Sequence, residues 1–158
     1  MRFVPSEFEV PDLLEHDRFR LRPLTVHDLV KDYDAVMSSR EHLWDQFGQA
    51  WGWPPADLTL EQDLIDLGWH QKEFQRRSSF AYAVMSPDET RLLGCVYVDP
   101  PETAGYDAEV WLWVRASELG TGLEAELYAT VRRWVEERWP IDKVAYPGRE
   151  PGVRGDGR

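Results

Sequence analysis

The sequence predicts a single α+β domain with a mixed, mostly antiparallel central sheet and flanking helices. Apolar residues recur at helical spacing over 25–39 and 59–77, and the period then changes to two. A strand over 106–115 is followed by a helix over 120–137 and a last strand over 141–146. Strands joined through a helix pair in parallel, whereas strands joined by a short turn pair antiparallel, so we expect a mixed sheet.

The chain is expected to begin with an extended arm, a strand and a helix. Residues 1–17 are charged and interrupted by proline, which is typical of an extended arm. Apolar and basic residues alternate over 19–24, and this alternation predicts a half-buried strand. Thr25 and Asp28 lie three residues apart, close to a capping box, and predict the start of the helix over 25–39.

Two further helices are expected before the sheet continues. Apolar spacing predicts a short helix over 41–48, and the Gly and Pro residues of 49–57 predict a loop. Thr59 begins a capping-box pattern, so a helix should run over 59–77. Gly68 lies inside this helix and weakens it by roughly 1 kcal/mol relative to Ala.

The middle of the chain predicts three strands. Residues 79–86 and 91–98 are strand-like and flank the turn-forming residues 87–90, which predicts a hairpin. A Pro- and Gly-containing loop over 99–105 leads to the third strand, 106–115. These three strands would form the centre of the sheet.

The last helix and strand complete the domain. Apolar residues line one face of 120–137, and Pro140 ends the helix before the strand over 141–146. Residues 147–158 are rich in Gly, Pro and Arg and predict a flexible tail. The folded domain is therefore expected to cover 18–146.

Charge excludes some partners. The chain has 18 Lys and Arg against 29 Asp and Glu, a net charge of −11, and no basic cluster. Nucleic-acid binding needs such clusters, so we expect no nucleic acid partner. An acidic surface suits a cationic amine substrate, although solubility explains it equally well.

Cysteine and histidine usage argues against a metal site. Cys95 is the single cysteine, and the four His residues show no paired ligand spacing, so no metal is predicted. The first residues do not resemble a signal peptide, and no apolar run approaches the length of a membrane span. We therefore expect no membrane association and a cytoplasmic protein.

Gly120, Thr121 and Gly122 lie where the strand over 106–115 turns into the following helix. Backbone N–H groups at a helix N-terminus are unpaired, and glycine lets a phosphate approach them. These residues predict a phosphate or pyrophosphate site. A purely structural turn is the alternative interpretation.

Five segments together resemble the GNAT superfamily of acetyl-CoA-dependent N-acetyltransferases, in the branch similar to ribosomal-protein alanine acetyltransferases. They are FRLRPLTVHD (19–28), FAYAVM (80–85), RLLGCVYV (91–98), AEVWLWVR (108–115) and LGTGLE (119–124). The resemblance implies an acyl-CoA N-acyltransferase fold and acetyl-CoA as cosubstrate. It also implies transfer of an acetyl group to a primary amine of a small molecule or protein.

The resemblance assigns cofactor-binding residues. Trp113 and Val114 would pair through their backbone with the pantetheine arm. Gly120, Thr121, Gly122 and Leu123 would bind the pyrophosphate.

The turn departs from the family pattern of Gln/Arg-x-x-Gly-x-Gly/Ala. One register places Leu119 at the Gln/Arg position and Glu124 where Gly or Ala is expected, and there a carboxylate would repel pyrophosphate. A register shifted by two places Ser117 at the Gln/Arg position and recovers Gly120 and Gly122 as the two glycines. In the first register, Glu124 pointing to solvent would instead complement the helix N-terminus.

Glu109 matches an acidic position that some family members use as the general base. Asp107 lies on the same side of the strand by the period of two and is expected to share this task. The alternative is that Glu109 faces outward or pairs with an Arg of a neighbouring strand.

Trp51 and Trp53 are the candidates for contacts with the acceptor substrate, and His70 and Trp44 are weaker candidates. A packed aromatic loop is the alternative interpretation for these side chains.

Family members continue after the last strand with a further helix and two strands, whereas twelve residues follow Tyr146 here. We therefore expect a shortened sheet whose edge near Ile141–Tyr146 is available for homodimerisation. A non-catalytic binding or dimerisation module that has lost CoA-dependent chemistry is the second functional hypothesis.

Overall fold

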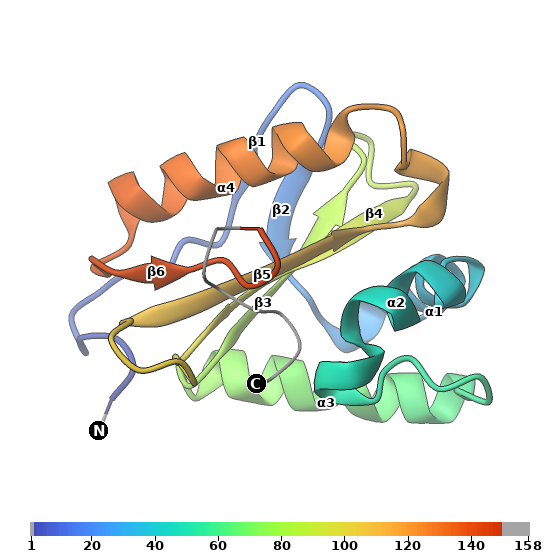
Figure 1. Cartoon of the computed structure of the whole chain (residues 1–158), viewed down its shortest axis with the longest axis horizontal. Coiled ribbons are helices and arrows are strands. Elements are labelled where there is room, and N and C mark those ends of the chain that lie inside the picture. The colour runs from blue at the N-terminus through green and yellow to red at the C-terminus, as the bar shows by residue number, and fades with distance from the viewer. Residues whose placement is uncertain (1, 150–158) are drawn as a thin grey trace.

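The computed structural model describes residues 2–149, so most of the tail expected at 147–158 lies outside the described residues. Six strands form one sheet in the order in which they occur in the chain (Figure 1). Neighbouring strands are antiparallel except for the last pair, which is parallel. The strands are β1 (Leu14–Glu15), β2 (Arg20–Pro23), β3 (Phe80–Met85), β4 (Leu92–Asp99), β5 (Ala108–Val114) and β6 (Val144–Ala145). The predicted mixed, mostly antiparallel α+β fold is confirmed.

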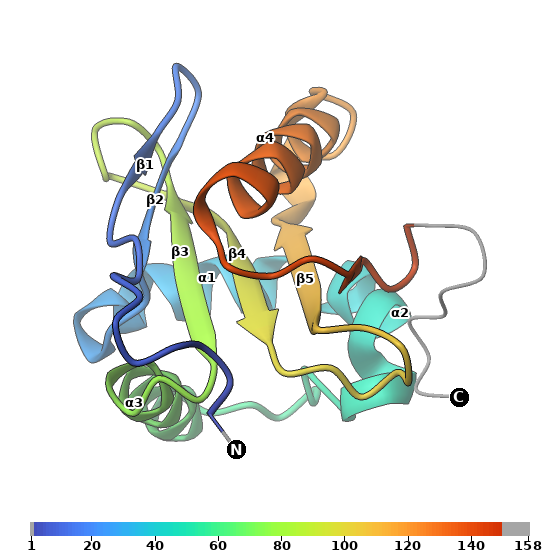
Figure 2. The ribbon, with the colours of Figure 1, turned by 90° about the vertical axis from the view of Figure 1, so that its left-hand side faces the viewer.

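Helices cover both faces of the sheet. Helix α4 lies on one face, and the other three α-helices lie on the opposite face (Figure 2). Short 3₁₀ turns precede α1 and α4. The helical elements are η1 (Val26–Asp28), α1 (Leu29–Ser38), α2 (Arg40–Trp51), α3 (Leu60–Gln75), η2 (Ala116–Glu118) and α4 (Leu123–Arg138).

The alternation of side chains along the strands builds two cores. On β3, Tyr82 and Val84 contribute to the core under α4, whereas Ala81 and Ala83 contribute to the core under α1–α3. Trp113 of β5 is fully buried in the second core. The sheet is therefore apolar on both faces, as expected of a sheet with helices on both sides.

Helix α2 and the last strand differ in extent from the sequence prediction. Helix α2 continues to Trp51, beyond the predicted end at 48, because Gln49–Trp51 contain no helix breaker and the Trp51 ring stacks on Phe47 at 4.5 Å. Gly52, at φ +61°, ends the helix in the left-handed conformation that favours glycine. The strand predicted over 141–146 shortens to the two residues of β6.

The N-terminal arm packs against the domain. Val4 is buried, and the ring of Phe8 lies 5.2 Å from that of Trp139. The guanidinium of Arg77 donates hydrogen bonds to the carbonyl oxygens of Pro5 and Phe8, at 2.7 and 2.8 Å. The arm thus adds side chains to the core under α4.

Strand β6 lies at an edge of the described sheet, and dimerisation through it stays a prediction. Among residues 2–149, no helix is both long and apolar enough to cross a bilayer.

Candidate functional site

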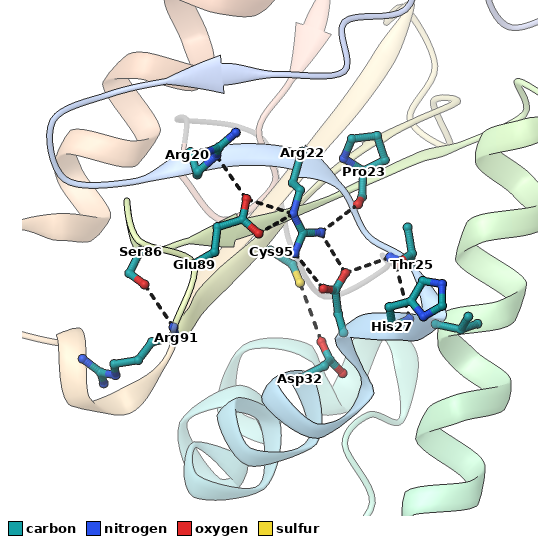
Figure 3. Close-up of polar contacts among 12 residues, drawn as sticks. Arg20, Arg22, Pro23, Thr25, His27, Asp32, Ser86, Glu89, Arg91 and Cys95 are labelled. Atoms are coloured by element: carbon teal, nitrogen blue, oxygen red, sulfur yellow. Dashed lines mark hydrogen bonds and ion pairs between the residues drawn. The ribbon is translucent and has the colours of Figure 1, made fainter.

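An ion-paired network fixes the start of α1 against the sheet (Figure 3). Arg22 donates to both carboxylate oxygens of Asp28, at 2.8 and 3.0 Å, and its Nε donates to Glu89 of the β3–β4 turn at 3.0 Å. Asp28 also accepts from the backbone N–H of Thr25, which completes the predicted capping box. These carboxylates raise the pKa of Arg22, so its guanidinium is charged at any physiological pH. It holds α1 in a fixed position on β2 and β3.

Asp32 lies one turn beyond Asp28 and is buried beneath α1. Its Oδ1 lies 4.0 Å from Sγ of Cys95 on β4, a contact that Figure 3 shows. Burial and the neighbouring Asp63 raise the pKa of Asp32 well above its ordinary value. Burial likewise raises the pKa of the Cys95 thiol, which makes it a poor nucleophile.

A cavity of about 760 Å³ lies between α3, the end of α2 and the strands β4 and β5. We call it the acidic pocket. Seven of its described lining residues are Asp or Glu, and none is Lys or Arg. The side chains that define it below are Asp32, Asp63, Tyr97, Asp99 and Glu109.

The acidic pocket brings together most of the residues that the sequence predicted for substrate and catalysis. Trp51, Trp53, His70 and Glu109 all line it. Burial lowers the pKa of His70, which favours the neutral imidazole. Trp44 does not line the acidic pocket and instead lies under the guanidinium of Arg40.

Glu109 is buried and anchored by the loop that follows β4. Its Oε1 accepts hydrogen bonds of 3.0 Å from the backbone N–H groups of Glu102 and Thr103 and from the Thr103 hydroxyl. Asp107 is in a different position, because its carboxylate accepts the backbone N–H of Lys143 at 2.9 Å. The structure therefore separates the two predicted acids: Glu109 lines the acidic pocket, and Asp107 joins β5 to the segment before β6.

Asp99 is a candidate that the sequence analysis missed. It lies directly across from Glu109 in the antiparallel pair β4–β5 and is hydrogen-bonded by the Ser79 hydroxyl. Burial, with the nearby Glu73, Glu109 and Glu102 adding repulsion, raises the pKa of Asp99 to about 6. Asp99 lies two residues after Tyr97 and therefore on the same face of β4, which the sequence pattern could have shown. Only the strand register places Asp99 beside Glu109.

The outer edge of β5 pairs with another strand only at Ala108 and Glu109, where β6 lies beside it. Arg115 pairs with Leu93 through its N–H, so the alternation of the ladder directs the backbone groups of Val110, Leu112 and Val114 away from β4. The Leu112 carbonyl accepts from Gln46 Nε2 at 2.9 Å, and the Val114 carbonyl contacts His42 Nε2 at 3.2 Å.

Trp113 faces the opposite way from this edge. Its backbone belongs to the ladder with β4, and its indole N–H donates to the Tyr97 hydroxyl at 2.9 Å. Of the two residues predicted to meet a pantetheine arm, Val114 presents its backbone to the free edge and Trp113 does not.

The glycine turn opens onto a hollow at the N-terminus of α4. Gly120 and Gly122 have φ of +82° and +83°, a region that favours glycine, and both line a cavity of about 580 Å³. Thr121 closes the turn, because its hydroxyl donates to the Glu118 carbonyl at 2.7 Å. Leu123, the first residue of α4, is buried.

The first turn of α4 is suited to an anion. The Thr121 hydroxyl accepts the backbone N–H of Leu123 at 3.3 Å, whereas the N–H groups of Glu124 and Ala125 have no partner among the described residues. Arg149 also lines the hollow and pairs with Glu124 at 2.7 Å. The carboxylate expected to repel a pyrophosphate is thus neutralised by a cation from the chain's C-terminal segment.

The family model for the acetyltransferase (GNAT) domain matches residues 18–147. No curated protein sequence matches the chain. Several solved structures have a similar fold.

The ribosomal-protein-S5-alanine acetyltransferase from Vibrio fischeri is 17% identical with a TM-score of 0.66, covering 90% of this chain and 77% of that one. The acetyltransferase from Salmonella typhimurium that modifies the N-terminal serine of ribosomal protein L7/L12 is 13% identical with a TM-score of 0.65, covering 82% and 70%. The microcin C7 self-immunity acetyltransferase, solved with acetyl-CoA and AMP, is 14% identical with a TM-score of 0.68, covering 85% and 72%. At these identities the likeness shows the fold.

Proposed function

The chain belongs to the acetyltransferase (GNAT) domain family, and on this premise we propose that it transfers an acetyl group from acetyl-CoA to a primary amine. One observation carries the proposal. Strand β5 contributes Glu109 to the acidic pocket, has an outer edge that no strand covers beyond Glu109, and leads through η2 into the glycine turn. One strand therefore connects a place for the amine with a place for the nucleotide.

The residues at the turn fit a diphosphate. Gly120 and Gly122 leave the hollow open, and the unpartnered N–H groups of the first turn of α4 can donate to phosphate oxygens. Arg149 adds a positive charge at the same place. The backbone N–H groups of Leu112 and Val114 would pair with the pantetheine arm, and its amides would replace the side chains that now contact the two carbonyls.

Bound acetyl-CoA would supply the acetyl group as a thioester. The amine nitrogen would attack the thioester carbonyl carbon, so that a C–N bond forms, the C–S bond breaks and the sulfur leaves as thiolate. The amine must also lose a proton, and the paired carboxylates Asp99 and Glu109 would accept it. With a pKa of about 6, Asp99 is ionised at neutral pH and still basic enough to act.

A rate assay with matched variants tests this assignment. Thiol release from acetyl-CoA would be measured with wild type, Asp99→Asn, Glu109→Gln and Asp107→Asn, with the exposed Glu61→Gln as control. Loss of the general base lowers kcat by on the order of 10²–10⁴. We expect this loss in Asp99→Asn or Glu109→Gln and little change in Asp107→Asn. A selective loss in Asp107→Asn would reject the assignment.

A non-catalytic module is the second candidate function. It is favoured by one contact: the Arg149 guanidinium already donates to the Leu112 carbonyl, at 3.1 Å, on the edge of β5 that the pantetheine arm would use. This function predicts that millimolar acetyl-CoA leaves the melting temperature unchanged, whereas a cosubstrate raises it by binding the folded state.

A further inference from the structure

The acidic pocket contains more carboxyl groups than a single ammonium group needs. Its described lining has seven carboxyl side chains and no Lys or Arg, and burial disfavours the charged form of His70. Buried carboxylates without counter-charges are costly, and proteins rarely keep them without a ligand or partner. The lining therefore calls for a cationic ligand.

The carboxyl groups fall into two clusters. Asp32, Asp63 and Asp66 come from α1 and α3, and the first two interact with each other. Asp99 and Glu109 form the other cluster at the ends of β4 and β5. The electrostatic neighbours of Asp99 are Glu73, Glu102 and Glu109, with no member of the first cluster among them.

The spacing of residues along β4 gives the scale of the separation between the clusters. Asp32 contacts the Cys95 side chain, and Asp99 lies four residues further along the same strand on the same face. At about 3.3 Å per residue, this places the end of the first cluster that contacts Cys95 about 13 Å from Asp99. Tyr97 lies between them, so the span is aromatic rather than charged.

The first cluster contains a buried acceptor that no N–H group reaches. Asp63 is 2% exposed and lines the acidic pocket, and for its Oδ2 the described chain offers only the neighbouring carboxyl of Asp32. Buried polar atoms are nearly always hydrogen-bonded, so this pair of carboxyl groups is the part of the lining where a cationic donor would add most. No three His, Cys, Asp or Glu side chains of residues 2–149 are arranged to hold a metal ion.

Aromatic rings form the middle of the acidic pocket. The rings of Trp51 and Trp111 have centroids 4.9 Å apart, and Trp51 and His70 each lie against Tyr97, at 5.7 and 5.5 Å. Such rings contact methylene groups well and attract cations. A peptide backbone would need donors for its carbonyl groups, whereas carboxylates, which only accept, dominate the polar part of this lining.

We propose that the acidic pocket selects an elongated aliphatic amine with a positive charge at each end. The reacting amine would lie at Asp99 and Glu109, the methylene chain against the aromatic rings, and the distal ammonium at Asp63 and Asp66. This assignment rests on the proposed acetyl transfer, which it deepens by naming the acceptor class.

Matched amines test the assignment with the wild-type protein alone. 1,8-Diaminooctane, octylamine and 8-aminooctanoate have the same chain and differ only in the distal charge, and 1,4-diaminobutane tests the span. A hydrogen-bonded charge contributes roughly tenfold to a hundredfold. We expect kcat/KM for 1,8-diaminooctane to exceed that for octylamine by this factor, with 8-aminooctanoate the poorest acceptor and 1,4-diaminobutane well below 1,8-diaminooctane.

Variants then locate the distal charge. Asp63→Asn and the half-buried Asp66→Asn should lower kcat/KM for 1,8-diaminooctane about tenfold and leave octylamine unchanged, whereas the exposed Asp45→Asn, outside the acidic pocket, should change neither. Circular dichroism shows whether each variant folds. If Asp63→Asn does not fold, the comparison of the two amines is made with Asp66→Asn.

The outcomes separate this inference from the proposed function. Equal kcat/KM for octylamine and 1,8-diaminooctane, or better acetylation of an alanyl peptide, overturns the diamine assignment and leaves acetyl transfer intact. Calcium raising the melting temperature through Asp63 would also overturn it, in favour of a metal site.

If no amine is acetylated and acetyl-CoA does not bind, the proposed function fails. Calorimetric binding of 1,8-diaminooctane that Asp63→Asn abolishes would still support the pocket assignment, and absence of that binding would reject it.

Discussion

Arg149 joins Glu124 to the edge of β5. Its guanidinium donates to Glu124 Oε2 at 2.7 Å and to the Leu112 carbonyl oxygen at 3.1 Å. The first contact removes the repulsion that Glu124 would exert on a diphosphate at the glycine turn. The second occupies a backbone acceptor on the edge where a pantetheine arm would lie. Arg149 is therefore placed either to assist CoA binding or to block it.

Replacing Arg149 distinguishes these roles. We expect Arg149→Ala to weaken CoA binding about tenfold in calorimetry, because it removes a cation and leaves Glu124 unpaired beside the phosphates. The exposed Arg133→Ala, on helix α4, serves as the charge-matched control. Arg149→Ala combined with Glu124→Gln should recover part of the loss. Tighter binding in Arg149→Ala alone would show that the side chain blocks the edge of β5.

Gly122 and Gly68 make a matched pair of glycine replacements. Gly122 has φ +83°, so Gly122→Ala should destabilise the protein by about 1–2 kcal/mol and weaken CoA binding. Gly68 lies inside α3 with only a Val26 methyl group near its position at 3.8 Å, so Gly68→Ala should stabilise by up to about 1 kcal/mol. Thermal unfolding with and without CoA measures both. Equal effects of the two replacements would contradict the backbone argument.

The pH dependence of the rate should report Asp99. Its pKa of about 6 means that the carboxylate is protonated below this pH and cannot accept a proton from the amine. We therefore expect kcat/KM for the amine to fall as pH decreases through about 6, and this acid limb to disappear in Asp99→Asn. An unchanged acid limb in the variant would assign the limb to another group.

Asp32 should make stability depend on pH in the opposite sense from a salt-bridged acid. Its folded pKa is raised, so its contribution is fully favourable below its unfolded pKa, near 4, and is lost as pH rises towards the folded value. Asp32→Asn should therefore reduce the loss of melting temperature between pH 5 and pH 8. The exposed Asp45→Asn removes the same charge and is the control, and an identical profile for both variants would count against the burial argument.

The sequence predicted most elements because the local signals agree with the packing. Thr59 accepts a hydrogen bond from the Gln62 N–H, and α3 begins one residue later, as the capping-box pattern indicates. The period of two in residues 80–98 also matches the two apolar faces of β3 and β4. These predictions depend on neighbours within a few residues.

The missed features depend on contacts between distant residues. Asp99 joins Glu109 through strand register, and Arg149 meets Glu124 across 25 positions. Trp51 was assigned to a loop because Gly and Pro follow it, whereas its stacking on Phe47 extends α2. Spacing alone carries no information on such pairings.

The hydrogen bonds of Arg77 to the N-terminal arm have a practical consequence for work with fragments of the chain. Residues 18–147 match the family, but a fragment starting at residue 18 would leave Phe80 without Phe3 and Trp139 without Phe8. Exposed aromatic rings of this kind promote self-association. A fragment intended to fold and remain monodisperse should therefore begin before Phe3, well ahead of the point where family similarity starts.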